Sequence, residues 1–375
     1  MKLSPRSATS SLNPFARPAR LCLAGAGDDE KICSMAVEGL AGDRANAVWG
    51  DGAANDMSAR GFGRVGNNAN LGSGSGVMNS RKTDQGAAAL ATSAALPAGP
   101  VSYGRKGALE VRLARSAREI DAAQAVRYRV FYEEMSAKAD EATLLSKRDA
   151  DRFDEICDHL LVVDHDLVPE GEGADGDLPP EAVVGCYRLL RQEVAERHGG
   201  FYTASEYDIA PLLARHADLN FLELGRSCVL PPYRTKPTVE LLWHGIMHYV
   251  TAHKLDVMFG CASFEGTEPE KLAPALSWLH HHHAAPEDWK VRALPELYVE
   301  MNRIPEPDLD QREALRMLPP MIKGYLRAGC YIGEGAVIDW QFGTTDVLIL
   351  FPVAQISDRY LSKFGTKYGT PGKKS

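Results

Sequence analysis

The chain has 375 residues, of which 45% are hydrophobic and 25% are charged, and this composition is ordinary for a globular protein. Its formal net charge of -8 argues against a nucleic-acid-binding protein, because such proteins normally carry a basic patch or stripe. No apolar run approaches the roughly 18 residues that a membrane-spanning helix needs.

The N-terminal part of the chain differs in composition from the rest. Residues 61–80 are mostly Gly, Asn and Ser with few apolar anchors. Such a segment buries too little apolar surface to offset the entropy lost on ordering. We therefore predict that residues 1–105 form a disordered extension. Residues 1–27 contain no acid and resemble a transit peptide. An ordinary bacterial extension, or a start codon placed too early, is the interpretation we favour for them.

The folded part is predicted to open with a strand and a helix. Residues Leu109 to Leu113 alternate between apolar and polar side chains, as a half-buried strand does. Ser116 and Glu119 have the spacing of a capping box, with Ser116 as the N-cap. The helix that follows continues through Val126 and Val130 at helical spacing.

The later elements alternate between strands and helices around one predicted sheet. A long helix is expected to begin at Thr238 and to continue to His253, with apolar residues on one face. An acidic, Gly- and Pro-rich loop spans residues 164–180. Further strands are predicted at residues 159–163, 182–190, 221–230, 256–264 and 346–353. This order predicts a mixed α/β fold.

Six motifs follow one another along the folded part of the chain: Arg127-Tyr-Arg-Val-Phe131, Asp151-Arg-Phe-Asp154, and residues 185–190, 201–208, 221–229 and 343–349. In this order they resemble the motifs of the GNAT-type acyltransferases. Within that superfamily they are similar to the ornithine N-acyltransferases of bacterial ornithine-lipid synthesis, often called hemolysin-like. Acyl-homoserine lactone synthases share part of the set. The resemblance implies a GNAT-like fold with a central twisted mixed sheet flanked by helices. We place this domain at residues 106–365, followed by a flexible basic tail at 366–375.

Glu223 and Arg226 are the predicted catalytic residues. Residues three apart on a regular strand face opposite sides, and Gly225 between them permits a bulge that re-aims one side chain. The resemblance implies that this strand parts from its neighbour and offers a backbone N–H to the thioester carbonyl. Glu223 is then suited to take a proton from the attacking ammonium, and Arg226 to bind the acceptor's carboxylate. The alternative is a structural ion pair within a sheet.

Five further residues are predicted to bind the substrate. Asp151 and Asp154 are carboxylates that suit the two cationic groups of ornithine, although a solvated loop or a helix cap explains them equally well. Arg127 and Phe131 share a helix face, so Phe131 is placed along the acyl channel with Arg127 closing over it. The alternative is a core phenylalanine and a surface arginine. Arg188, in the motif at 185–190, completes the set.

The acyl donor is predicted to meet Tyr233, Arg234 and Lys236. Coenzyme A-dependent GNAT enzymes have a glycine-rich loop at this place, whereas here the glycines are missing and Pro237 removes an N–H. The two cations suit a single phosphate, as on the phosphopantetheine arm of acyl carrier protein. We expect no cofactor apart from the one that the donor brings. We also predict no metal site, because His280 to His283 do not converge on one helix face.

The resemblance implies transfer of a 3-hydroxyacyl group from acyl carrier protein to the α-amino group of L-ornithine, giving lyso-ornithine lipid. One alternative is an acyl-homoserine lactone synthase, which uses S-adenosylmethionine and is usually shorter, or another N-acyl amino acid synthase. A second alternative, from another class, is a non-catalytic acyl-binding or membrane-lytic protein. The Glu223 and Arg226 pair argues against this second alternative.

The location is predicted to be cytoplasmic, with peripheral binding to the inner face of the membrane. The chain has seven cysteines, an odd number without a Cys-x-x-Cys pair, which suits free thiols in a reducing compartment. Ile356, Tyr360 and Phe364 recur at helical spacing near Arg359 and Lys363. This pattern is typical of a helix that docks on an anionic membrane surface. Packing of the same stripe on the enzyme's own sheet is the alternative.

Overall fold

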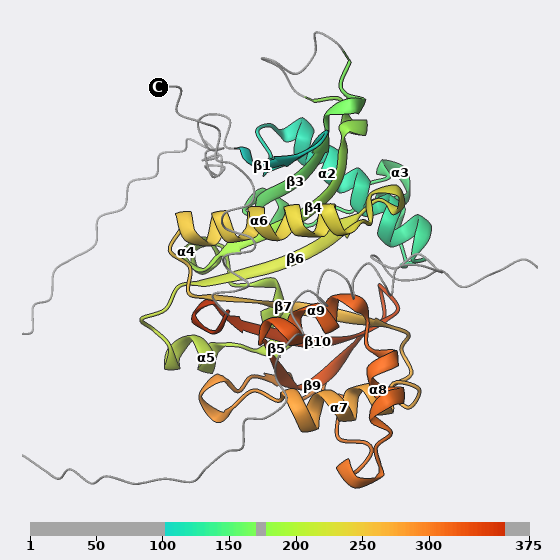
Figure 1. The fold of residues 1–375 in the computed structure, drawn as a ribbon, viewed down its shortest axis with the longest axis vertical. Coiled ribbons are helices and arrows are strands. Elements are labelled where there is room, and N and C mark those ends of the chain that lie inside the picture. The colour runs from blue at the N-terminus through green and yellow to red at the C-terminus, as the bar shows by residue number, and fades with distance from the viewer. Residues whose placement is uncertain (1–101, 170–177, 357–375) are drawn as a thin grey trace, which may run out of the picture. The chain divides into compact units, whose positions relative to one another are not determined.

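The structure is a computed structural model that describes residues 102–169 and 178–356 (Figure 1). The first described strand begins at Ser102, a few residues before the predicted domain boundary at 106. Nearly all of the predicted N-terminal extension lies outside the described residues, as do the basic tail and the C-terminal stripe from Tyr360 onward. Ile356, the first residue of that stripe, is buried in the core of the protein and therefore does not face a membrane.

One ten-stranded sheet organises the described chain, in the order β1-β2-β3-β4-β6-β7-β10-β9-β8-β5. Neighbouring strands are antiparallel except for the β6–β7 and β8–β9 pairs, which are parallel. The strands are β1 (Ser102–Lys106), β2 (Leu109–Leu113), β3 (Asp158–Asp164), β4 (Val183–Arg191), β5 (Tyr207–Asp208), β6 (Phe221–Val229), β7 (Val257–Glu265), β8 (Arg292–Ala293), β9 (Tyr331–Asp339) and β10 (Thr344–Pro352). The predicted mixed α/β class with a central mixed sheet is confirmed.

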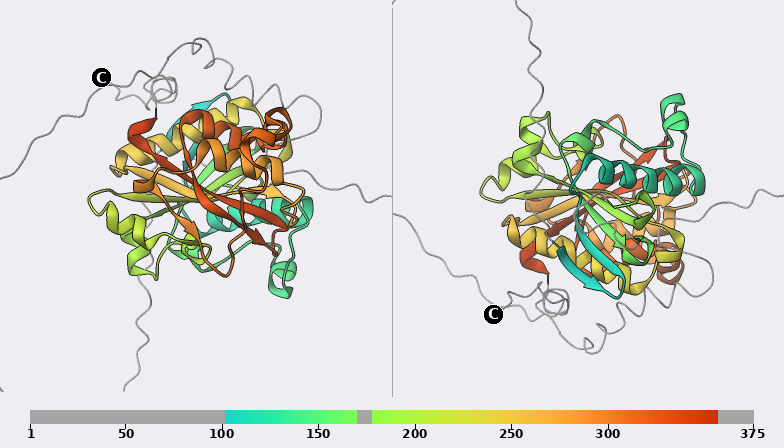
Figure 2. Two further views of the ribbon diagram at one scale, coloured as in Figure 1. Left: turned by 90° about the horizontal axis from the view of Figure 1, so that it is seen from below. Right: turned by 90° about the horizontal axis from the view of Figure 1, so that it is seen from above.

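Helices cover both faces of the sheet, and the alternation of side chains along β3 shows how. Leu160 and Val162 point into the core beneath α6, whereas Leu161 and Val163 point into the core beneath α2. Both faces of β3 are therefore buried at this point, which is why Leu160 to Val163 form an unbroken apolar run. Figure 2 shows α2 and α6 on opposite sides of the sheet. The helices are α2 (Ala117–Tyr128), α3 (Glu141–Ser146), α4 (Gln192–Arg197), α5 (Ala210–Arg215), α6 (Lys236–Ala252), α7 (Ala273–His283), α8 (Gln311–Met317) and α9 (Pro320–Ala328).

Two helix starts test the capping predictions. Ser116 caps α2 and accepts a hydrogen bond from the backbone N–H of Glu119, as predicted. The Glu119 carboxylate does not complete the box, because it binds the buried guanidinium of Arg112 at 2.6 and 2.8 Å. The prediction that Thr238 caps the long helix was wrong. That helix begins at Lys236 with Thr235 as its N-cap, and Thr238 is buried within its first turn.

No helix among residues 102–169 and 178–356 has the length and apolarity that crossing a membrane requires.

Candidate active site

Strands β6 and β7 part in the middle of the sheet. Their pairing covers only Phe221 to Glu223 of β6. Beyond that point β6 stays paired with β4, whereas β7 stays paired with β10. The register between β4 and β6 shifts between Cys186 and Arg188, so the predicted bulge in β6 is present. The residue that adopts the left-handed conformation is Arg226, with a φ of 50°, and not Gly225.

Two cavities meet at this opening. Leu224, Gly225, Arg226 and Ser227 line both, so the parted segment of β6 is their common wall. The acidic cavity, as we call the first, is lined by residues that include Arg188, Tyr202, Glu206, Glu223, Asp339 and Asp346. The apolar cavity is lined by residues that include Tyr187, Trp243, Phe259, Tyr325, Ile349 and Phe351. The opening thus joins a space suited to a charged molecule to a space suited to a hydrocarbon chain.

Glu223 lies at the point where the strands part and is only 5% exposed. Its carboxylate accepts hydrogen bonds from the backbone N–H groups of Tyr202, at 2.9 Å, and Thr203, at 2.6 Å. Burial raises its pKa, although these hydrogen bonds and the charge of Arg188 oppose the rise. A carboxylate has about four lone-pair sites, so the two backbone bonds leave capacity for a further proton.

Arg226 turns its guanidinium toward two aspartates and two aromatic rings. Its Nε lies 3.3 Å from Asp149 Oδ2, and its Nη2 lies 3.4 Å from Asp151 Oδ2. The guanidinium carbon lies 5.0 Å from the centroid of the Tyr202 ring and 4.8 Å from that of Phe342. These contacts fix the side chain in the wall of both cavities.

The predicted substrate-binding residues Asp154, Arg127 and Arg188 form one buried ion network. Arg127 holds Asp154 through two bonds of 2.7 and 2.8 Å and is 1% exposed. Arg188 Nη1 binds Asp151 Oδ1 at 2.6 Å and lines the acidic cavity. Asp151 and Asp154 also form a capping box at residues 152–155, which is the alternative that the sequence left open. Their role in binding a substrate stays a prediction.

Phe131 lines the acidic cavity and packs edge-on against Phe342, with ring centroids 5.5 Å apart. It follows α2 in a π-helical turn at Arg129–Glu134. Phe131 is not among the residues that line the apolar cavity, so its predicted place along the acyl channel stays a prediction. Arg127, on the same predicted face, is not among the residues that line either cavity.

The predicted donor loop makes contacts of its own. Arg234 is 8% exposed and binds both carboxylate oxygens of Glu134, at 2.5 and 2.6 Å, together with the carbonyl oxygen of Val229 at 2.9 Å. Tyr233 donates its hydroxyl proton to Asp164 at 2.7 Å. Lys236 is the first residue of α6. Binding of a phosphate by the three residues stays a prediction.

Three acids of the acidic cavity were missed by the sequence analysis. Glu206 follows the turn at Tyr202–Ser205, Asp339 ends β9 and Asp346 lies in β10. Glu206 and Asp346 both fall within the quoted motifs, but nothing in a single sequence indicates that the three meet. The one available signal is the polar start of β10, where three polar residues precede a run of apolar ones.

Gly260 of β7 permits the close approach of β6 to β7 one residue beyond their last paired residues, Glu223 and Phe259. A Cβ at this position would lie 2.2 Å from the carbonyl oxygen of Leu224. We expect Gly260→Ala to lower the free energy of unfolding by about 1–3 kcal/mol, because the overpacked strands must separate, and to reduce activity. Urea denaturation and the rate of acyl transfer measure the two effects.

Gly324→Ala in α9 is the matched control, because a Cβ there meets nothing within 4 Å. This control is expected to leave stability unchanged or to raise it by up to about 1 kcal/mol. A Gly260→Ala protein as stable and as active as the wild type would contradict the account of this contact.

The chain is similar in sequence to acyltransferases of known function. Residues 126–244 match the family described as "Acetyltransferase (GNAT) domain". An L-ornithine N(alpha)-acyltransferase of Agrobacterium fabrum is 55% identical over 263 residues, which are 70% of this chain and 87% of that protein. One of Rhizobium meliloti is 54% identical over 275 residues, which are 73% and 90% of the two chains. The solved structure of FeeM, an N-acyl amino acid synthase from uncultured soil microbes, is 12% identical with a TM-score of 0.38 and covers 70% of this chain and 99% of its own.

Proposed function

The chain belongs to the family of L-ornithine N(alpha)-acyltransferases, and we propose on that basis that it transfers a 3-hydroxyacyl group from acyl carrier protein to the α-amino group of L-ornithine. The observation that carries the proposal is the opening between β6 and β7, where an acidic cavity and an apolar cavity share one wall. A diamino acid and a fatty acyl thioester are the pair of substrates that such a site suits.

The proposed reaction begins with the loss of a proton from the acceptor's α-ammonium, because only the neutral amine attacks a carbonyl carbon. Glu223 takes this proton, directly or through a water molecule. The amine nitrogen then bonds to the thioester carbon, and the carbonyl oxygen becomes an oxyanion. Backbone N–H groups of β6 beyond Glu223, where β7 is no longer its partner, are the proposed donors to that oxyanion. The intermediate collapses as the C–S bond breaks. The nitrogen loses its second proton to give the amide, and the sulfur of the phosphopantetheine arm takes up this proton and leaves as the free thiol.

Arg226 is proposed to bind the carboxylate of the amino acid. Its planar fork of N–H donors matches a carboxylate better than a lysine would. Asp149 and Asp151 hold the guanidinium in place from one side, and the rings of Tyr202 and Phe342 pack beside it. Arg188 is proposed to position Asp151.

The donor is proposed to be a carrier protein and not coenzyme A, since the loop before α6 lacks the glycines of a pyrophosphate site. Lys236, at the first turn of α6, is the proposed contact of the phosphopantetheine phosphate, with Tyr233 beside it. Arg234 is proposed to position this loop through Glu134, because its two Nη atoms already bind that carboxylate.

The product has one acyl chain and a charged head, so we propose that the enzyme works in the cytoplasm at the inner face of the membrane. Binding there is expected to be weak and reversible, because each basic residue near an anionic surface adds about 1 kcal/mol. Flotation with anionic vesicles at low and high salt measures it, and a protein that floats at neither salt concentration contradicts the proposal.

The test of the whole proposal is a reaction of the purified full-length chain with 3-hydroxyacyl carrier protein and one acceptor at a time, followed by mass spectrometry of the products. Ornithine is expected to give the Nα-acyl product, and lysine, glycine and serine much less. Acyl-coenzyme A in place of the carrier protein is expected to lower kcat/KM. Formation of a homoserine lactone with S-adenosylmethionine, or equal rates with the two donors, would contradict the acceptor and the donor respectively.

A further inference from the structure

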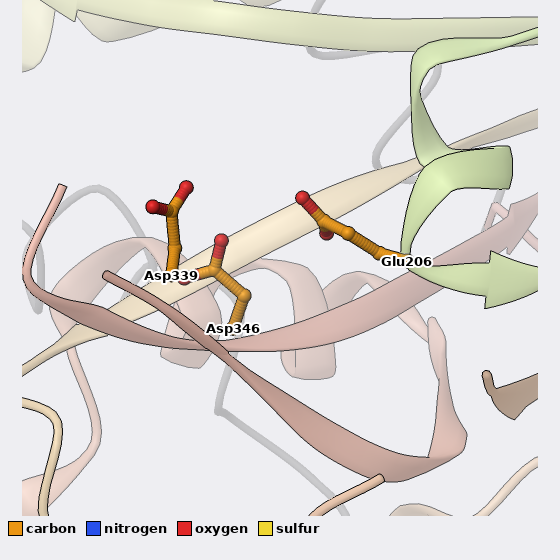
Figure 3. Close-up of side chains that lie close together, drawn as sticks. All are labelled: Glu206, Asp339 and Asp346. Carbon is orange, nitrogen blue, oxygen red and sulfur yellow. The ribbon is translucent and has the colours of Figure 1, made fainter. Parts of the chain in front are cut away.

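Three carboxylates, two from the hairpin of β9 and β10 and one from the residue before β5, share one space in the acidic cavity. Figure 3 shows the side chains of Glu206, Asp339 and Asp346 approaching from different elements. One carboxylate oxygen of each lies within 4.8 Å of the other two. All three residues line the acidic cavity, and Glu206 and Asp346 are 8% and 7% exposed.

The cluster carries negative charge that no cation of the described chain neutralises by contact. Among residues 102–169 and 178–356, none of the three acids forms an ion pair, in contrast to Asp149, Asp151 and Asp154 nearby. Glu206 accepts only a weak donor, the Cys261 thiol at 3.0 Å. Asp346 Oδ1 is buried and has no hydrogen-bond partner in the part of the chain that the structure describes.

The raised pKa values of two of these acids show that the site disfavours their charged forms. Burial, followed by the charge of Asp346, raises the pKa of Glu206 to about 7. Burial is also the largest cause that raises the pKa of Asp346 to about 6, and Asp339 adds to it, although hydrogen bonds from Ser263 and Thr344 and the charge of Arg226 oppose the rise. Buried carboxylates without a cation are unfavourable, so a site of this kind is best explained by a positively charged ligand.

The position of the three acids in the sheet indicates which positively charged group of the substrates they bind. Asp346 pairs with Ser263 of β7, and Asp339 lies on β9, so two of the acids lie on the far side of β7 from the parted segment of β6. The reacting amine belongs beside β6, where Glu223 lies. A group that reaches β9 and β10 from there is the far end of the acceptor.

We propose that Glu206, Asp339 and Asp346 bind the side-chain ammonium of a diamino acid and thereby select the acceptor. The inference rests on the proposed function. An ammonium has three N–H donors, and three carboxylates surround the space. A Ca²⁺ ion would need six to eight oxygen ligands and Mg²⁺ an octahedral set. Asp339 also accepts hydrogen bonds from the backbone N–H groups of Gln341 and Phe342 at 2.8 and 3.0 Å.

The test compares ornithine with norvaline, which has the same carbon chain but lacks the side-chain ammonium. With the full-length enzyme, kcat/KM for ornithine should exceed that for norvaline, and Asp346→Asn should reduce this ratio on the order of 10²-fold, because a buried charge partner is lost. The value for norvaline should change little. Asp339→Asn tests the same inference if the first variant fails to fold. Asp308→Asn, at an exposed position, is the control that should leave the ratio unchanged.

Calorimetry of the two amino acids without donor gives a second measurement that does not depend on acyl transfer. Tighter binding of ornithine, lost in Asp346→Asn, supports the inference even if no acyl product forms, in which case the proposed function fails alone. Equal loss of activity with both acceptors would overturn the inference, because the acids would then act on the shared α-amino group. Activity that EDTA abolishes and Ca²⁺ or Mg²⁺ restores would overturn it in favour of a metal site.

Discussion

Replacing Glu223 with glutamine is expected to lower kcat by about 10²- to 10⁴-fold while leaving the KM of the donor nearly unchanged. The glutamine oxygen still accepts one of the two backbone hydrogen bonds that Glu223 accepts from Tyr202 and Thr203. The amide has no capacity to take a proton from the acceptor, and its NH₂ group faces the second N–H. Steady-state kinetics with acyl carrier protein and ornithine measure the loss.

The pH profile separates a base from a structural group. Burial raises the pKa of Glu223, and a base must be deprotonated, so the wild-type rate should fall as the pH drops through this raised value. The loss caused by Glu223→Gln should shrink at high pH, where more of the amine is already neutral. Glu268→Gln, at an exposed position, is the matched control. A fully active variant, or a loss that is the same at every pH, would contradict the role as a base.

Arg127→Ala is expected to lower the free energy of unfolding by about 3–5 kcal/mol, because it leaves buried carboxylates without a counter-charge. Arg127 binds Asp154 through two bonds, and its Nε lies 2.8 Å from Asp149 Oδ2. Both aspartates are 5% exposed, so water does not replace the lost guanidinium. Urea denaturation at neutral pH measures the change.

The effect should depend on pH with a definite sign. Burial alone would raise the pKa of Asp154, but its bonds to Arg127 hold it well below its usual range. A depressed carboxyl pKa stabilises the fold above the unfolded value, and this stability is lost as the pH falls through the folded value. The difference between wild type and variant should therefore shrink in acid. Lys271→Ala, in an exposed pair with Glu268, should change stability by less than about 1 kcal/mol. A comparably small effect of Arg127→Ala would contradict the buried network.

The long strands were predictable where they carry an apolar run or a regular alternation, and β9 was not. The predicted strands at 109–113 and 159–163 correspond to β2 and β3, since apolar side chains there fill one or both faces. Strand β9 was missed because Gly333 and Gly335 break its apolar pattern. Glycine is required at both positions because residues elsewhere in the chain leave no room for a Cβ. A Cβ at Gly333 would lie 2.9 Å from the Leu348 Cβ, and one at Gly335 would lie 2.4 Å from the ring of Tyr298.

Four of the residues that the sequence motifs singled out lie together in the structure, and their roles stay predictions. Glu223, Arg226, Arg188 and Phe131 all line the acidic cavity. An ion pair between residues that are distant in the chain leaves no local pattern. The ion pairs of Arg127 with Asp154 and of Arg234 with Glu134 could therefore not be predicted from the sequence. Glu206 lies close to Asp339 and Asp346 because β5 and β10 belong to one sheet. The order of strands in that sheet could not be predicted from the sequence alone.

Strands β9 and β10 are antiparallel neighbours joined by the short connection at 340–343, so Asp339 and Asp346 belong to one continuous hairpin. Glu223 and Arg226, by contrast, lie on β6, far earlier in the chain. The acids of the hairpin, which are proposed to select the acceptor, and the residues of β6, which are proposed to carry out acyl transfer, therefore lie on separate segments of the chain. A single recombination event that exchanges residues 331–352 between related enzymes would carry two of the three acids with it. The proposed selection therefore predicts that exchanging this hairpin alters the choice of acceptor while β6 and its groups stay unchanged.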